Sequence, residues 1–140
     1  MQTTIRIAAF ALTASALAAV LPAQAHHSFA AEYDASKPVK LTGKVTKVEW
    51  TNPHIFIYLD VPDEQTGAAV NWALELGAPN ALMRLGWKRD SLKVDDVVIV
   101  EGTLAKDGSR LANATTIVLQ ATGRRMLAGS SGGGNTDAQR

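Results

Sequence analysis

Apolar and polar side chains alternate along most of the middle of the chain, which is the pattern of β-strands with one buried face. In the first such segment the apolar positions change from odd to even numbers between Val45 and Val48, so we expect a β-bulge near Thr46 and Lys47. Gly43 allows a sharp bend just before that bulge. The strands that the pattern predicts are residues 39–50, 54–61, 70–76, 95–102 and 111–119.

Residues 77–86 depart from this alternation and carry the signals of a short helix. Pro79 suits the first helical position, and Gly86 suits a left-handed residue that ends the helix. With that end at Gly86, we expect Trp87 to pack back onto Leu82.

The order of these elements, three strands, one short helix and two strands, predicts a mostly β fold. Together with the bent first strand, it is the order of an OB-fold. We therefore expect a small five-stranded OB-fold-like Greek-key barrel with the helix between the third and fourth strands. The alternative is a small β-sandwich in which the helix is incidental.

The first 25 residues have the pattern of a secretory signal peptide. Arg6 precedes an apolar run at residues 7–21, which is shorter than the roughly 18 to 20 apolar residues of a membrane span. Ala23 and Ala25 form an A-x-A cleavage site, so we expect cleavage after Ala25 and a mature chain that begins at His26. The expected location is the periplasm or the secreted fraction, with no membrane span.

The other end of the chain reads GSSGGGNTDAQR, a composition that cannot bury apolar surface. We expect it to be a disordered tail. The predicted organisation is a signal peptide at 1–25, an N-terminal arm at 26–38, the OB-like barrel at 39–127 and the Gly/Ser-rich tail at 128–140.

Composition excludes two classes of protein. There is no cysteine, so the exported chain must fold without disulfides, and it cannot be a lipid-anchored lipoprotein. The 14 basic and 13 acidic side chains nearly cancel, and Arg6 is the only charged residue before position 26. A neutral mature chain argues against a nucleic-acid partner, because such partners are held by many Lys and Arg contacts to phosphate.

The residues favour a binding protein over an enzyme. Cysteine is absent, and every histidine lies near a loop or terminus instead of beside an evident Ser–Asp pair, so the sequence offers no evident arrangement for nucleophilic catalysis. OB-folds bind ligands on the face built by the second and third strands. There we expect Phe56, Tyr58 and Asn71, beside the loop that holds Asn52, to bind a small ligand or a periplasmic protein.

The three histidines, His26, His27 and His54, are the candidate metal ligands. A mature chain that begins at His26 offers an α-amine and a ring nitrogen from one residue, and His54 would complete a three-nitrogen histidine brace that suits Cu(II). His27 is too close along the backbone to complete that geometry easily. Cleavage after Ala23 would instead give an X-X-His terminus, which also binds Cu(II) or Ni(II).

The function hypotheses are therefore a periplasmic binding module and, as the alternative, a periplasmic copper-binding protein, with a copper-dependent oxidase as its enzymatic extreme. The plainer interpretation of the histidines also stays open: a mobile arm holds His26 and His27, and His54 caps a turn or packs beside Trp50.

Several short motifs resemble a family of small exported bacterial proteins of unknown function. They are HHSF at residues 26–29 with Tyr33 shortly after, W-x-N-P-H at residues 50–54, and Gly86-Trp87. The resemblance extends from His26 to about residue 119. It implies export and a small β-rich fold, and it assigns no catalytic residue.

Overall fold

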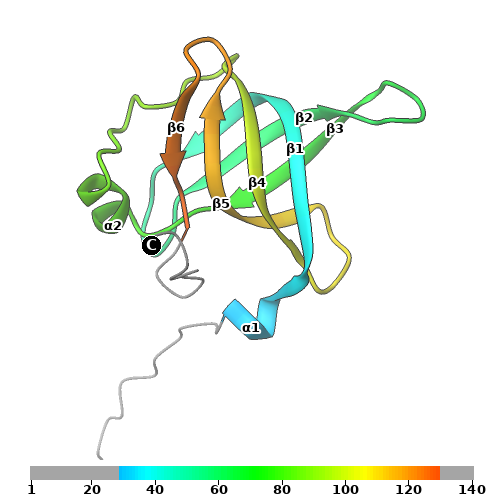
Figure 1. Cartoon of the computed structure of the whole chain (residues 1–140), viewed down its shortest axis with the longest axis horizontal. Coiled ribbons are helices and arrows are strands. Elements are labelled where there is room, and N and C mark those ends of the chain that lie inside the picture. The colour runs from blue at the N-terminus through cyan, green and yellow to red at the C-terminus, as the bar shows by residue number, and fades with distance from the viewer. Residues whose placement is uncertain (1–28, 130–140) are drawn as a thin grey trace, which may run out of the picture.

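The computed structural model describes residues 29–129 (Figure 1). Strands dominate, with one very short helix before the first strand and a second short helix between the third and fourth strands. In chain order the elements are α1 (Phe29–Glu32), β1 (Tyr33–Glu49), β2 (Phe56–Pro62), β3 (Ala69–Glu75), α2 (Pro79–Arg84), β4 (Val97–Ala105), β5 (Leu111–Leu119) and β6 (Arg124–Leu127).

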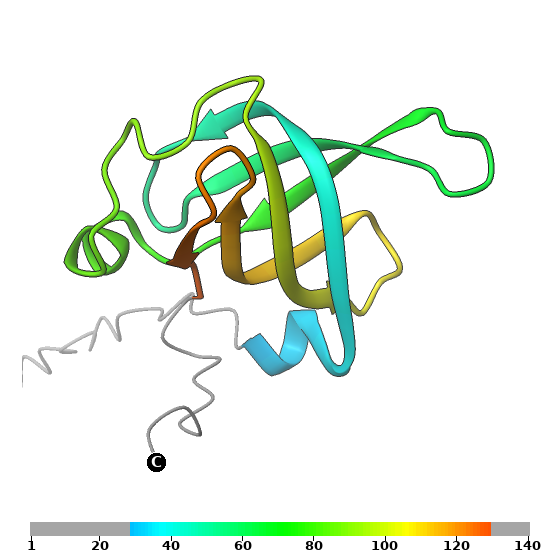
Figure 2. The same cartoon turned by 45° about the horizontal axis from the view of Figure 1, so that its top comes forward.

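The strands form one sheet in the order β3-β2-β1-β4-β5-β6, and an additional pairing between β3 and β5 closes a ring of hydrogen bonds. The closing pair is parallel and short, joining residues 73–75 to residues 111–113, whereas the other pairs are antiparallel. Figure 2 shows the sheet curling around into a barrel-like shape. The predicted fold class, mostly β and OB-like with one short helix between the third and fourth strands, is confirmed.

β1 bends where the sequence predicts a bulge. Its register with β2 shifts between Val45 and Lys47, so that Thr46 is skipped in the strand pairing and only its hydroxyl donates to the carbonyl of Tyr58 on β2, at 3.2 Å. Gly43 allows the close approach at the bend, because a Cβ there would lie 2.7 Å from the carbonyl oxygen of Asp60. The bend lets one long strand pair with β4 along its first part and with β2 along its end.

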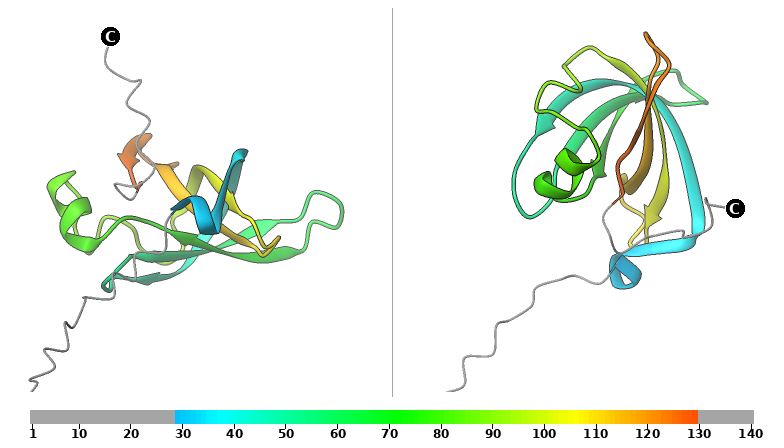
Figure 3. Two further views of the ribbon diagram at one scale, coloured as in Figure 1. Left: turned by 90° about the horizontal axis from the view of Figure 1, so that it is seen from below. Right: turned by 60° about the vertical axis from the view of Figure 1, so that its left-hand side comes forward.

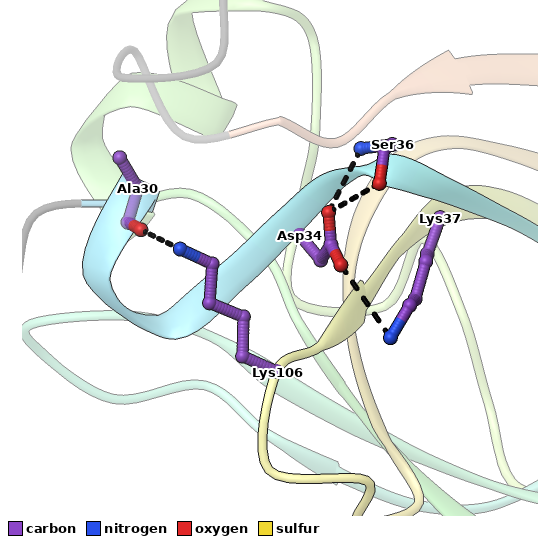
Figure 4. Close-up of polar contacts among 5 residues, drawn as sticks. All are labelled: Ala30, Asp34, Ser36, Lys37 and Lys106. Atoms are coloured by element: carbon purple, nitrogen blue, oxygen red, sulfur yellow. Dashed lines mark hydrogen bonds and ion pairs between the residues drawn. The ribbon is translucent and has the colours of Figure 1, made fainter.

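β1 begins at Tyr33, earlier than the start at residue 39 that the sequence suggested. The segment before it is held by the β4–β5 turn, where the backbone N–H of Lys106 donates to the carbonyl of Glu32 at 2.9 Å. The Lys106 ammonium also donates to the carbonyl of Ala30 at 2.6 Å (Figure 4). α1 is therefore fixed against one end of the sheet.

α2 ends as its sequence predicts. Gly86 has φ +90°, and the backbone N–H of Trp87 donates to the carbonyl of Leu82 at 3.0 Å. Both side chains are buried, and the Trp87 indole donates to the carbonyl of Leu127 at 2.7 Å. That hydrogen bond ties the segment after α2 to β6 (Arg124–Leu127), a strand that the sequence pattern did not predict. The largest fully buried side chains are Val45, Ile55, Ile57, Leu59, Leu74, Leu76, Leu82, Val98, Val100 and Ile117.

Some predictions lie outside the described residues. They are the signal peptide, His26 and His27, and nearly all of the Gly/Ser-rich tail. Within residues 29–129, no helix is long and apolar enough to cross a bilayer.

Candidate functional site

A buried carboxylate joins His54 to the start of the folded chain. The Nδ1 atom of His54, in the β1–β2 connection, is paired with Oε1 of Glu75 at the end of β3. The hydroxyl of Tyr33, the first residue of β1, donates to Oε2 of the same carboxylate. The Glu75 side chain is 8% exposed and the His54 side chain 34% exposed, so a buried carboxyl group contacts a histidine that solvent reaches.

Strand register explains why Glu75 reaches this position. Glu75 is opposite Phe56, and Phe56 is opposite Glu49, so all three lie on the outer face of the sheet. An outward glutamate is normally solvated, but Tyr33 lies over this one and is itself 3% exposed. The ring of Phe29 stacks on that of Tyr33 with centroids 5.4 Å apart. The segment around α1 thus covers the seam between β3 and β5.

The electrostatics of the cluster fix its hydrogen positions. Burial, and then the hydrogen bond to Glu75, raise the pKa of Tyr33 above its usual range, so the hydroxyl keeps its proton and donates it. A carboxylate has only acceptors, so its contact with Nδ1 of His54 requires the proton on that nitrogen. In the neutral ring, Nε2 of His54 is then the nitrogen with the free lone pair, the one available to a metal ion.

The structure brings together three of the four predicted ligand-binding residues, Phe56, Tyr58 and Asn71. The polar groups of Tyr58 and Asn71 already form hydrogen bonds within the protein. Tyr58 and Asn71 lie on the same outer face as Phe56. The Tyr58 hydroxyl donates to Oε2 of Glu49 at 2.9 Å, and the hydrogen bond to Glu49 raises the pKa of Tyr58.

The amide of Asn71 donates to Asp60 at 2.9 Å and to Thr46 at 3.3 Å. Asn52 is exposed in the turn before β2. Most of the polar atoms on this face therefore bond to neighbours on the same face. Phe56, which is half-buried, is its apolar centre.

The predicted metal ligands are only partly within the described residues. His54 is present, whereas His26 and His27 precede the first described residue, Phe29. Among residues 29–129, no three His, Cys, Asp or Glu side chains come together in a group that would hold a metal ion. A metal site built from described residues alone would therefore have to rely on His54 as its single imidazole.

Sequence reasoning missed Tyr33 and Glu75 as parts of the site. Glu75 alternates with apolar residues as a solvated glutamate would, and Tyr33 lies in the segment that was expected to be an arm. The local pattern held no signal for their contact, because it joins residues 42 positions apart. The motifs that resemble the exported family were the useful pointers, since W-x-N-P-H at residues 50–54 ends on His54 and Tyr33 follows HHSF.

Comparison with known proteins places the chain in a family. The family of unknown function DUF6152 matches residues 14–114, most of the chain. The chain belongs to DUF6152. The DUF6152 match includes Tyr33, His54 and Glu75, so the whole cluster lies inside the part that defines membership. No curated protein matches the chain.

Proposed function

We propose that this DUF6152 protein is exported and binds one Cu(II) ion, with His54 as a ligand and with His26, as the mature N-terminus, supplying its ring and its α-amine. The observation that supports this most directly is the buried Glu75 carboxylate on Nδ1 of His54. Histidines that bind metals almost always give their other ring N–H to a carboxylate or carbonyl, which orients the ring and makes the ligating nitrogen more basic.

The N-terminal histidines precede a segment that contacts the cluster around His54. Phe29 stacks on Tyr33, Tyr33 donates to Glu75, and Glu75 contacts His54, so the described chain begins beside the cluster. His26 is only a short stretch before Phe29, and a stretch of that length spans at most ~10 Å. The arm does not have to cross the barrel to deliver its nitrogen ligands.

The donor set favours Cu(II). Imidazole and amine nitrogens are good ligands for that ion, whereas Cu(I) prefers thiolate and thioether sulfur. The sequence has no cysteine, and its three methionines are isolated from one another. His27 is a neighbour of the proposed brace and is not needed for it, because His26 and His54 already provide three nitrogens.

A second candidate function is a periplasmic binding module that holds a small ligand or a protein partner on the outer face of β2 and β3. Its support is the position of Phe56, which is half-buried and lies between Glu49 and Glu75 in the register. Asn52, Tyr58 and Asn71 would border a ligand there. A ligand on Phe56 would also lie beside His54, so the two candidates share one surface.

Metal titration of the exported protein tests the proposal. Intact mass should show a chain that begins at His26, and Cu(II) added to metal-free protein should bind one to one, with nitrogen hyperfine structure in the electron paramagnetic resonance spectrum. His54→Ala should remove one nitrogen and weaken binding. One extra residue before His26 should do the same, because it removes the α-amine and keeps all three rings.

His27→Ala is the matched control, because it deletes an imidazole next to the brace without touching it. It should bind Cu(II) as the unaltered protein does. If the extended chain and His54→Ala both keep full affinity, there is no brace. If only His27→Ala loses affinity, the ligand set is wrong. A chain that keeps residues 1–25 after secretion would contradict the predicted processing.

A further inference from the structure

A cleft at the opposite end of the β2–β3 hairpin from His54 is not used by the proposed metal site. It has a volume of about 540 Å³. The side chains of Val61, Val70 and Trp72 line one wall, and Leu41 of β1 lies among the lining residues with the cations Lys40 and Arg110. Clefts of this size at the mouths of β-barrels are common places for small ligands.

The cleft exists because the ring closes over only a few residues. β3 pairs with β5 at residues 73–75, so Ala69 to Trp72 extend past the start of β5. Figure 3 shows the β2–β3 hairpin extending beyond the rest of the sheet. Trp72 is opposite Leu59, whose side chain is fully buried, so the indole lies on the core face of the hairpin. It is nonetheless only half-buried, because β5 does not continue beside it.

Arg110 is the free cation of this cleft. Its backbone carbonyl accepts from the N–H of Ala73 at 3.0 Å, which fixes the residue beside the end of the β3–β5 pairing. Among the ion pairs of the described residues, Lys40 is paired with Glu101 at 3.5 Å, and Arg110 takes part in none.

Among the described ion pairs, neither acidic residue of the cleft is paired with Arg110. Oδ1 of Asp63 accepts from the N–H and the hydroxyl of Thr66 and from the N–H of Gln65. Hydrogen bonds from Thr66 chiefly lower the pKa of Asp63, and the charge of Arg110 has the smallest effect on it. That carboxylate closes the β2–β3 turn. Glu64 is exposed in the same turn. The guanidinium of Arg110 therefore remains available to bind a charged group of a ligand.

We infer that this cleft binds an amphipathic carboxylate, with the apolar body of the ligand against Trp72 and Val70 and its carboxylate on Arg110. A guanidinium holds a carboxylate through two parallel N–H bonds, and the half-buried indole loses its remaining exposure to water when an apolar chain covers it. The ligand class follows from an apolar wall that ends at an unpaired cation. The site is separate from the Cu(II) site and does not depend on it.

Nuclear magnetic resonance of the full mature protein without added copper tests the inference. The chain has 3 tryptophans, Trp50, Trp72 and Trp87, so each indole N–H reports on its own place. Decanoate, below its micelle concentration, should shift the Trp72 signal saturably and leave the signal of Trp87 in place. Decanol and decylamine have the same chain without the carboxylate, and both should bind more weakly.

Arg110→Gln should weaken decanoate binding about tenfold, the loss expected for one charge-assisted contact. Arg124→Gln is the matched control, since Arg124 is an exposed arginine on β6 and lines a different cleft, and it should change nothing. The inference fails if decanoate leaves the Trp72 signal unshifted, if decanol or decylamine binds as well as decanoate, or if Arg110→Gln binds as the unaltered protein does.

Discussion

Replacing Glu75 with Gln should reverse the proton position on His54. Tyr33 is 3% exposed and has to donate its hydroxyl proton, so it would hold the amide oxygen of the new side chain. The amide NH2 group would then lie against Nδ1 of His54, where Glu75 has an oxygen. Nδ1 would have to accept, so the ring proton would move to Nε2, the nitrogen that we assign to metal binding.

The loss of stability depends on how much weaker a hydrogen bond to a neutral amide is than one to a charged carboxylate. A hydrogen bond to a charged group contributes about 1.5–3 kcal/mol and a neutral one about 0.5–1.5 kcal/mol. Because the Glu75 side chain is 8% exposed, solvent screens the change little, and we expect Glu75→Gln to lower the free energy of unfolding by about 1–2 kcal/mol. Without the supporting carboxylate, Cu(II) binding should weaken about 10- to 100-fold.

The proton position can be measured without any metal. Imidazole ¹⁵N chemical shifts distinguish a protonated from an unprotonated ring nitrogen, and His54→Ala identifies the signals that belong to His54. The spectra should be recorded at a pH where the imidazole is neutral. Urea unfolding gives the stability change on the same samples.

Glu49→Gln is the control, because Glu49 lies on the same outer face across Phe56 and contacts Tyr58 and Lys47 instead of His54. It should leave the His54 signals unchanged. If Glu75→Gln keeps the proton on Nδ1 and unfolds at the same urea concentration, Glu75 does not orient His54. The structural support for the metal site would then disappear.

Three further predictions test the fold around the site. Since the pKa of Tyr33 is raised above its ordinary value of ~10, the folded state holds that proton more tightly, so its contribution to the free energy of unfolding should be complete below about pH 10 and fall as the pH rises above that value. In urea unfolding, Tyr33→Phe should therefore lose stability less steeply with pH than the unaltered protein, and equal slopes for the two proteins would contradict this. Gly102→Ala places a Cβ 2.2 Å from the carbonyl oxygen of Asn113, so thermal unfolding should show a loss of about 1–3 kcal/mol or more, and an unchanged midpoint would refute the close strand approach. Trp87→Phe removes the 2.7 Å hydrogen bond to the carbonyl of Leu127, so we expect the free energy of unfolding to fall by about 1 kcal/mol and the amide hydrogens of β6 to exchange faster. Unaltered exchange would show that this hydrogen bond does not hold the strand.

The sequence alone determined the features that depend on near neighbours. The alternation of apolar residues predicted each strand of the closed ring, and the residues of β5 match those expected. The change of parity between Val45 and Val48 located the bulge, and Gly86 located the end of α2. These signals are local, since a strand face repeats every second residue and a helix end needs one left-handed residue.

Only the tertiary structure decided what the ring of strands brings together. The parallel β3–β5 pairing joins segments far apart in the chain, and no periodicity in either strand specifies its partner. Tyr33 covers Glu75 only because β1 begins early and the β4–β5 turn holds the segment before it. An outward glutamate thereby became a buried support for His54, since burial depends on which distant segment lies over a face, whereas alternation fixes only the face itself.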